Sequence, residues 1–230
     1  IRETDNNLEK MLYAASGDYF SYKNIFTGKD IFKVHQMYTD GEKKFRPNIE
    51  KITNNLNKKD YIAVVTDAMN ANAEYYSFGE SEWIPKMIAS GTLPILVRTP
   101  SLINGRRKFD GGIADPLPAK KAYEMGAKKI VVIRTYEKKF KRQLKLENYI
   151  GALLSRKYPK LRRALLNHDK TYNKALDFIC NPPADCEIIQ LCPPEKLKSK
   201  RDSKNIEILK GDYEIGKKVA EKYLKRLKNL

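Results

Sequence analysis

The sequence has few of the side chains that bind metals or relay protons. Its 230 residues include two histidines, three cysteines and one tryptophan. Cys180, Cys186 and Cys192 follow one another at intervals of six residues, which fits neither a zinc knuckle nor a redox pair. His35 and His168 are distant from them in sequence. We therefore expect no metal site, and three cysteines without a disulfide framework favour a reducing compartment.

Long apolar runs are absent as well, because charges or prolines interrupt every candidate for a membrane span. With 41% hydrophobic residues the chain can still bury a substantial core. We expect a soluble, cytoplasmic protein. The first residue is Ile1 rather than Met, so we also expect that an upstream segment has been processed, truncated or omitted.

Basic residues are in excess, and they are concentrated in the second part of the chain. The net charge of +17 divides into +5 for residues 1–135 and +12 for residues 136–230. A basic face can bind an anionic membrane, bind nucleic acid, or only be well solvated. Nucleic acid is disfavoured, because no known binding motif and no regular alternation of aromatic and basic residues is present. The membrane and the solvated face stay open, and the pattern does not indicate an oligomeric state.

Residues 106–135 form the stretch around which the rest of the chain is organised. A short strand ends at Asp110, and Gly111 and Gly112 follow it directly. Glycine is free of the usual steric limits on φ and lets another group approach the backbone closely. The sequence therefore predicts a sharp turn that places the carboxylate of Asp110 at a strand end.

A helix and a second strand complete this stretch. The helix is expected to begin near Pro118, with Asp115 placed to cap it, and to end at Gly126. The apolar, β-branched run at 130–133 is typical of a strand buried on both faces of a parallel sheet. Together these elements predict a βαβ crossover, with Asp110 at the sheet edge where α/β proteins gather their ligands.

The rest of the chain offers weaker candidates for a functional site. Asp67 follows a predicted strand beside turn residues, which favours a structural role. Ser90 lacks the flanking glycines of a nucleophile turn, and His168 is expected at the surface or at a helix cap. Further elements are predicted as helices at 48–56, 83–89, within 143–179 and at 205–230, and as strands at 61–65 and 73–78.

An ordered set of segments resembles the patatin-like phospholipase family. They are KDYIAVVTDAMNANAEYYSF (59–78), MIASGTLPIL (87–96) and NGRRKFDGGIADPLP (104–118), with residues 156–179 similar to the helical extension of a bacterial subgroup. The resemblance implies a three-layer α/β/α sheet with buried parallel strands. Residues 1–135 would be the C-terminal portion of the catalytic domain, and 136–230 a basic, mainly helical extension.

The same resemblance implies lipid ester hydrolysis by a Ser-Asp dyad that needs no metal or organic cofactor. Asp110 takes the role of base, with Gly111 and Gly112 in the turn beside the substrate. The expected partners are a lipid or ester substrate and, through the basic part, the surface of an anionic membrane. Lipid degradation at such a surface is the implied role.

The nucleophile expected in that family is missing from this sequence. No Gly-x-Ser-x-Gly motif or glycine-rich oxyanion loop is present, and the nearest match, at 79–83, lacks its closing glycine. Two hypotheses remain. In the first, the chain is the second part of a longer hydrolase and is inactive alone. In the second, it is a catalytically inactive or basic module that binds an anionic membrane or nucleic acid. The retained Asp110 and both glycines favour the first.

Overall fold

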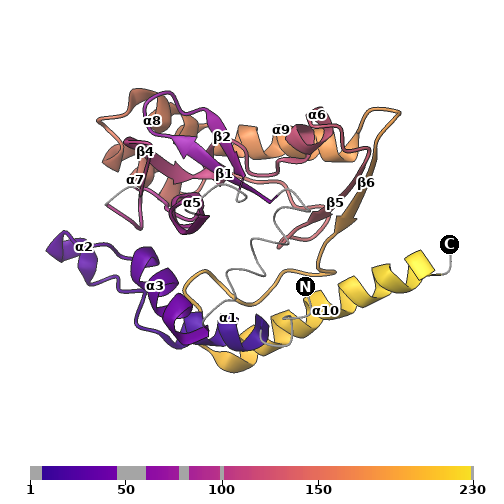
Figure 1. The fold of residues 1–230 in the computed structure, drawn as a ribbon, viewed down its shortest axis with the longest axis horizontal. Coiled ribbons are helices and arrows are strands. Elements are labelled where there is room, and N and C mark those ends of the chain that lie inside the picture. Colours follow the sequence, from indigo (N-terminus) through magenta and orange to yellow (C-terminus); the bar gives the residue numbers. More distant parts are fainter. Residues whose placement is uncertain (1–6, 46–60, 78–82, 99–100, 229–230) are drawn as a thin grey trace. The chain divides into compact units, whose positions relative to one another are not determined.

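The computed structural model describes residues 7–45, 61–77, 83–98 and 101–228 as a mixed α/β protein (Figure 1). The expected helix at 48–56 lies outside the described residues. The helices are α1 (Asn7–Ser16), α2 (Asn24–Thr27), α3 (Val34–Phe45), α5 (Trp83–Ser90), the 3-10 turn η2 (Gly111–Ile113), α6 (Ala119–Glu124), α7 (Leu146–Leu154), α8 (Pro159–Leu166), α9 (His168–Cys180) and α10 (Ile206–Lys228). The strands are β1 (Ile62–Asp67), β2 (Ala73–Ser77), β3 (Ser101–Ile103), β4 (Arg106–Asp110), β5 (Lys129–Ile133) and β6 (Glu187–Leu191).

The chain forms two compact units, each assembled from separate segments. The sheet unit, as we call it, comprises Asp18–Pro118 and Arg142–Ala175. The tail unit comprises Ile1–Gly17, Ala119–Lys141 and Leu176–Leu230. The sequence predicts a boundary between residues 135 and 136, which would separate a catalytic portion from an extension. This boundary divides the chain by function, and it stays a prediction.

An antiparallel sheet with strand order β2-β1-β4-β3 is the centre of the sheet unit. Its register pairs Val64 with Tyr75, and Val65 with Asp110. The hairpin between β3 and β4 turns at Asn104 and Gly105, which both have positive φ (51° and 71°). Consecutive positive φ values match the twist of two-residue hairpins, so the Asn-Gly dipeptide determines this turn.

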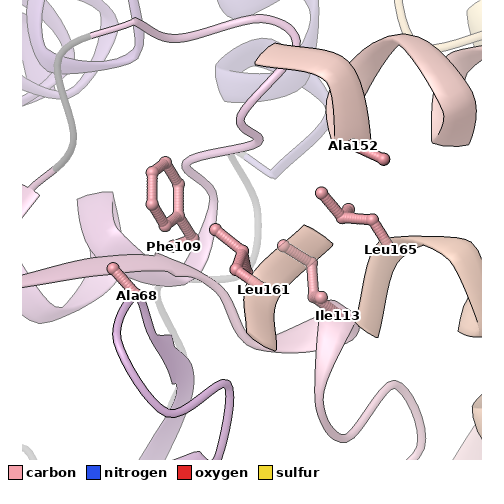
Figure 2. Packing of buried hydrophobic residues seen from close by; sticks show 6 residues of the cluster. All are labelled: Ala68, Phe109, Ile113, Ala152, Leu161 and Leu165. Carbon is pink, nitrogen blue, oxygen red and sulfur yellow. The ribbon is translucent and has the colours of Figure 1, made fainter. Parts of the chain in front are cut away.

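Helices cover both faces of this sheet. Val65 packs with Ala89 of α5 in one buried cluster. Phe109 points to the opposite side, because neighbouring strand residues alternate between faces. Figure 2 shows its cluster, in which side chains from the sheet meet α7 and α8: Ala68, Phe109, Ile113, Ala152, Leu161 and Leu165.

The tail unit contains a parallel pair of strands, β5 and β6, in which Ile130 pairs with Ile188. The expected crossover is wrong, because β4 belongs to the antiparallel sheet and β5 to this separate pair. Gly126 does end α6 in the left-handed conformation, with φ of 100°, as predicted. The expected burial of β5 on both faces is also wrong, since Val131 and Ile133 are 46% and 78% exposed.

The described residues therefore show a mixed α/β fold with one antiparallel and one parallel sheet, and the expected three-layer arrangement is not confirmed. The expected burial of β5 was wrong for a physical reason, because a run of β-branched residues looks the same whether one or both faces of its strand are covered. The helical, basic C-terminal part is confirmed by α7, α8, α9 and α10. Across the described ranges, no helix combines the length and the hydropathy that crossing a membrane requires.

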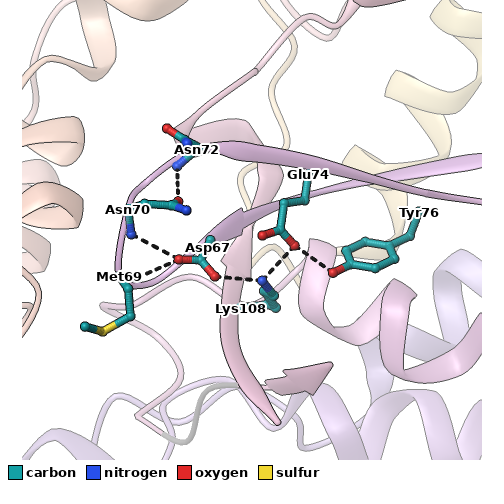
Figure 3. Close-up of polar contacts among 7 residues, drawn as sticks. All are labelled: Asp67, Met69, Asn70, Asn72, Glu74, Tyr76 and Lys108. Carbon is teal, nitrogen blue, oxygen red and sulfur yellow. Dashed lines mark hydrogen bonds and ion pairs between the residues drawn. The ribbon is translucent and has the colours of Figure 1, made fainter. Parts of the chain in front are cut away.

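A buried lysine of β4 forms ion pairs with β1 and β2 inside the sheet unit. The Lys108 side chain is 1% exposed, and its Nζ lies 2.7 Å from Asp67 Oδ2 and 2.7 Å from Glu74 Oε2. Tyr76 donates its hydroxyl hydrogen to the same Glu74 oxygen over 2.6 Å. Burial and the Glu74 carboxylate raise the pKa of Tyr76 to about 12. These contacts link β4 to β1 and β2 (Figure 3).

Asp67 also shapes the turn after β1. Its Oδ1 accepts hydrogen bonds from the backbone amides of Met69 (2.9 Å) and Asn70 (3.0 Å). Burial by itself would raise the pKa of Asp67, but the hydrogen bonds from Lys108 and from the two amides outweigh it and lower that pKa. The structural role predicted for Asp67 is confirmed.

Replacing Lys108 by methionine should destabilise the sheet unit strongly, because Asp67 and Glu74 lose the cation that neutralises them. We expect Lys108→Met to lower the free energy of unfolding by about 3–5 kcal/mol. Lys160→Met, at an exposed position in the same unit, should change it by less than about 0.5 kcal/mol. Urea unfolding of both variants measures the difference. Equal stabilities would contradict the role assigned to Lys108.

Candidate functional site

Asp110 is the last residue of β4, and its backbone and side chain are all held by hydrogen bonds. Its amide donates to the carbonyl of Thr92 (2.8 Å), and its carbonyl accepts the hydroxyl hydrogen of Thr66 (2.8 Å). The carboxylate Oδ1 accepts the amide hydrogen of Gly112 at 2.7 Å. Asp110 is half-buried. The predicted carboxylate at a strand end is present, and it has one defined orientation.

Position 111 requires glycine because there is no room for a side chain. The sequence had suggested a different reason, an unusual φ angle. Neither Gly111 nor Gly112 is among the described glycines with positive φ. A Cβ atom at Gly111 would overlap the carbonyl carbon and oxygen of Val64. The close backbone approach predicted for this turn is therefore correct, and it involves strand β1. At Gly112 a Cβ would lie 3.0 Å from Asp110 Oδ1, so a side chain there would press on the carboxylate.

Asp115 stabilises the same turn, in a way that differs from the predicted helix cap. Its amide donates to the carbonyl of Gly111 over 2.8 Å. Its carboxylate accepts the hydroxyl hydrogen of Tyr75, on β2, over 2.6 Å. The first residue of α6 is Ala119, so the cap position falls on Pro118. Asp115 thus ties the turn to the sheet.

His168 packs against the Asp110 turn, a contact that no pattern in the sequence predicts. Its ring hydrogen-bonds the Gly112 backbone, and its Nδ1 lies 3.3 Å from Asn148 Nδ2. Asn148 Oδ1 already accepts the Lys145 amide (3.0 Å), so Nδ2 is the donor and His168 Nδ1 the acceptor. The imidazole is therefore neutral. Burial, followed by the charge of Arg142, lowers the pKa of His168.

Two threonines that hydrogen-bond the Asp110 backbone use their hydroxyl groups to donate to backbone carbonyls. Thr92 donates its hydroxyl hydrogen to the carbonyl of Ile88 over 2.7 Å, and Thr66 donates to Asp110 itself. Ser90 ends helix α5 without the flanking glycines of a nucleophile turn. Thr66 and Thr92 therefore act as structural supports.

A pocket of about 570 Å³ lies at the opposite end of strand β4 from Asp110. Asp110 does not line it; its walls come from Asp67, Met69, Asn70, Gly105, Arg106, Arg107 and Tyr158. Among the residues that the structure describes, no group of three or more histidines, cysteines or acids is placed to hold a metal ion. Cys180, Cys186 and Cys192 are free thiols.

Parts of this chain are similar to a known family and to a known protein. A family model described as "Domain of unknown function (DUF6363)" matches residues 158–230, from the start of α8 through α10. The uncharacterized protein YjjU of Escherichia coli (strain K12) is 29% identical over 157 residues. That alignment covers 65% of this chain and 42% of YjjU, so the chain spans less than half the length of this relative.

These matches overturn the family resemblance inferred from the sequence. They indicate a domain of unknown function and an uncharacterized protein, and neither indicates a patatin-like phospholipase. The assignment was therefore wrong. It depended on short segments in a familiar order, and one of them, the supposed crossover after Asp110, does not form in the structure.

Replacing Gly111 by alanine should destabilise the protein, because the added methyl group meets the Val64 backbone, which cannot move without breaking β1. We expect a loss of about 2–4 kcal/mol in the free energy of unfolding. Gly41→Ala is the matched control, since a Cβ at this position of α3 enters open space. It should stabilise by up to about 1 kcal/mol. Thermal and urea unfolding test both, and a neutral Gly111→Ala would refute the packing argument.

Stability should fall in acid because of His168. Its pKa lies below the ordinary 6.5 in the folded protein, so the unfolded chain binds the proton more tightly. The contribution of the neutral imidazole to stability is complete above the ordinary pKa of 6.5, and it is lost as the pH falls from there through the lower pKa of the folded protein. Urea unfolding from about pH 7.5 to about pH 5 should show a smaller loss for His168→Gln than for the unmodified protein. His35→Gln, at an exposed histidine, should retain the full loss. Identical profiles for all three proteins would contradict a half-buried, neutral imidazole.

Proposed function

We propose that this chain supplies the proton-accepting aspartate of an ester hydrolase, and that the nucleophilic hydroxyl comes from a part of the protein outside these residues. The hydroxyl attacks the carbonyl carbon of an ester while Asp110 takes its proton. The alcohol leaves, and water then hydrolyses the acyl-enzyme. The substrate class we favour is a lipid ester, which would make this a serine acyl hydrolase with a Ser-Asp dyad.

The observation that carries the proposal is the fixed carboxylate of Asp110. A general base must meet a hydroxyl within hydrogen-bonding distance and at a defined angle. The 2.7 Å bond from Gly112 and the contact of Gly111 with Val64 hold this carboxylate on a strand rather than on a mobile loop. Sites built on strands position their groups more accurately than sites on loops.

The length of the relative also supports the proposal. The chain spans less than half of YjjU, which leaves room in such a protein for a nucleophile and an oxyanion site. A parallel sheet normally has both faces covered, yet Val131 and Ile133 of β5 are exposed. We propose that additional strands and helices of the whole protein extend the β5–β6 pair into a three-layer α/β/α sheet.

A second candidate is a non-enzymatic module that binds an anionic membrane or nucleic acid. The observation in its favour is the net charge of +12 in residues 136–230. This candidate gives Asp110 only a structural role in the turn, so the two candidates differ in what happens when its charge is removed.

Asp110→Asn in the protein expressed from its complete reading frame should remove the base and keep the fold. We expect the second-order rate constant for hydrolysis of p-nitrophenyl esters to fall by about 10²–10⁴-fold, the usual contribution of a general base. Asp115→Asn is the matched control, because the amide oxygen can still accept the hydrogen bond from Tyr75. It should keep activity near that of the unmodified enzyme.

Near-normal turnover by Asp110→Asn, with an unchanged unfolding midpoint, would refute the assignment. A fluorophosphonate probe reports the nucleophile independently. It should label the complete protein and not the chain of residues 1–230. Labelling of the shorter chain would show that its nucleophile lies within these residues and would contradict the proposed division.

A further inference from the structure

Helix α7 has two opposite faces, and the large apolar side chains lie on the outer one. Its outer face, as we call it here, consists of Leu146, Tyr149, Ile150, Leu153 and Leu154. These residues follow the spacing i, i+3, i+4, i+7 and i+8, which places them in one stripe along the helix. They are between 39% and 73% exposed. In a soluble helix this stripe normally faces the core.

The inner face of α7 is made of small and polar residues. Asn148, Gly151, Ala152 and Ser155 are all buried. Gly151 lies against helix α8, where an added Cβ would make an ordinary van der Waals contact of 3.6 Å with a methyl carbon of Leu165. The stripe of α7 that faces this core is therefore the small and polar one, and the outer face points away from it.

Cations flank the outer face at both of its ends. Exposed basic residues precede α7, and more follow it on the connection to α8 and on α8 itself, whereas Glu147 is the only acidic residue between positions 141 and 163. The exposed cations are Lys141, Lys145, Arg156, Lys157, Lys160, Arg162 and Arg163.

We propose that the outer face of α7 docks onto an anionic lipid bilayer. The leucines, isoleucine and tyrosine enter the boundary between headgroups and acyl chains, and the flanking cations bind the phosphate groups around them. Apolar residues bordered by lysine and arginine are the pattern of helices that lie in a membrane surface. The inference deepens the proposed function. Docking would give the proposed hydrolase access to its lipid substrate, and this part of the inference rests on the proposed function.

Other partners fit this surface less well. A nucleic acid would use the cations but leave five large apolar side chains in water. A second copy of the chain would bring two sets of like charges together, which costs free energy. An anionic bilayer satisfies both the apolar and the basic part of the surface at once.

The same helix also reaches the candidate site. Asn148, on the inner face, donates to His168, and His168 hydrogen-bonds the backbone of Gly112 beside Asp110. Docking through the outer face would therefore hold the Asp110 turn close to a surface from which a lipid ester can be drawn.

Co-sedimentation with vesicles tests the proposal on the chain itself. Vesicles of phosphatidylglycerol and phosphatidylcholine in equal parts should bind the chain, and pure phosphatidylcholine should bind it much less. Leu153→Glu should lower the partition coefficient on the anionic vesicles by about tenfold or more. Leu102→Glu is the matched control, because Leu102 is 59% exposed on β3, outside the outer face, and it should bind as the unmodified chain does.

The cations are tested by a separate variant. Arg156→Gln together with Lys157→Gln should lower anionic binding by roughly fivefold for each charge removed and leave the weak binding to neutral vesicles unchanged. Equal vesicle binding by Leu153→Glu and Leu102→Glu, with both variants folded by circular dichroism, would overturn the proposal. So would a concentration-dependent dimer that Leu153→Glu alone dissociates, or binding to DNA that replaces binding to vesicles.

Failure of this inference can be told apart from failure of the proposed function. Asp110→Asn should bind vesicles normally whatever its activity. If Leu153→Glu leaves binding intact while Asp110→Asn removes hydrolysis, docking by α7 is wrong and the base assignment holds. If Asp110→Asn stays active while Leu153→Glu loses binding, the base assignment is wrong and the docking surface holds.

Discussion

The contact between the backbone of Gly111 and the backbone of Val64 is the constraint on which the sheet unit depends. No other amino acid has room at this position, because a Cβ would overlap the Val64 carbonyl group. The contact brings the end of β4 against β1, so the hydroxyl of Thr66 can reach the Asp110 carbonyl. A single residue without a side chain therefore decides where the carboxylate of Asp110 lies.

The two faces of the sheet support this contact by different physical means. On one face, the buried charge of Lys108 is balanced by Asp67 and Glu74, an arrangement that is stable only while all three groups keep their positions. On the other face, Phe109 and Ile113 pack against α7 and α8 through apolar contacts alone. Charge pairing fixes the register of β4, and apolar packing holds α8 and α7, the helix that carries Asn148.

Local patterns predicted the elements well and their assembly poorly. The strands at 62–67 and 73–77, helix α5, the end of β4 at Asp110 and the stop at Gly126 could all be read from neighbouring residues. The partner of each strand could not be predicted, because an apolar run contains no information about which strand pairs with it. The supposed crossover and the family assignment failed for that reason. His168 was missed because 58 positions separate it from Asp110, and only the folded chain brings the start of α9 to the Asp110 turn.

Helix α7 shows why a correct helix prediction can still mislead about function. Its apolar stripe is regular, and the usual inference places such a stripe in the core. The structure buries the opposite stripe, whose Gly151 lies against Leu165 of α8. Because the inner face of α7, with its small residues, is buried, the outer face with its large apolar residues points outward, and cations flank it. The proposed attraction to an anionic bilayer thus starts from the stripe that the packing of α7 leaves exposed, and the helical pattern alone does not predict which stripe that is.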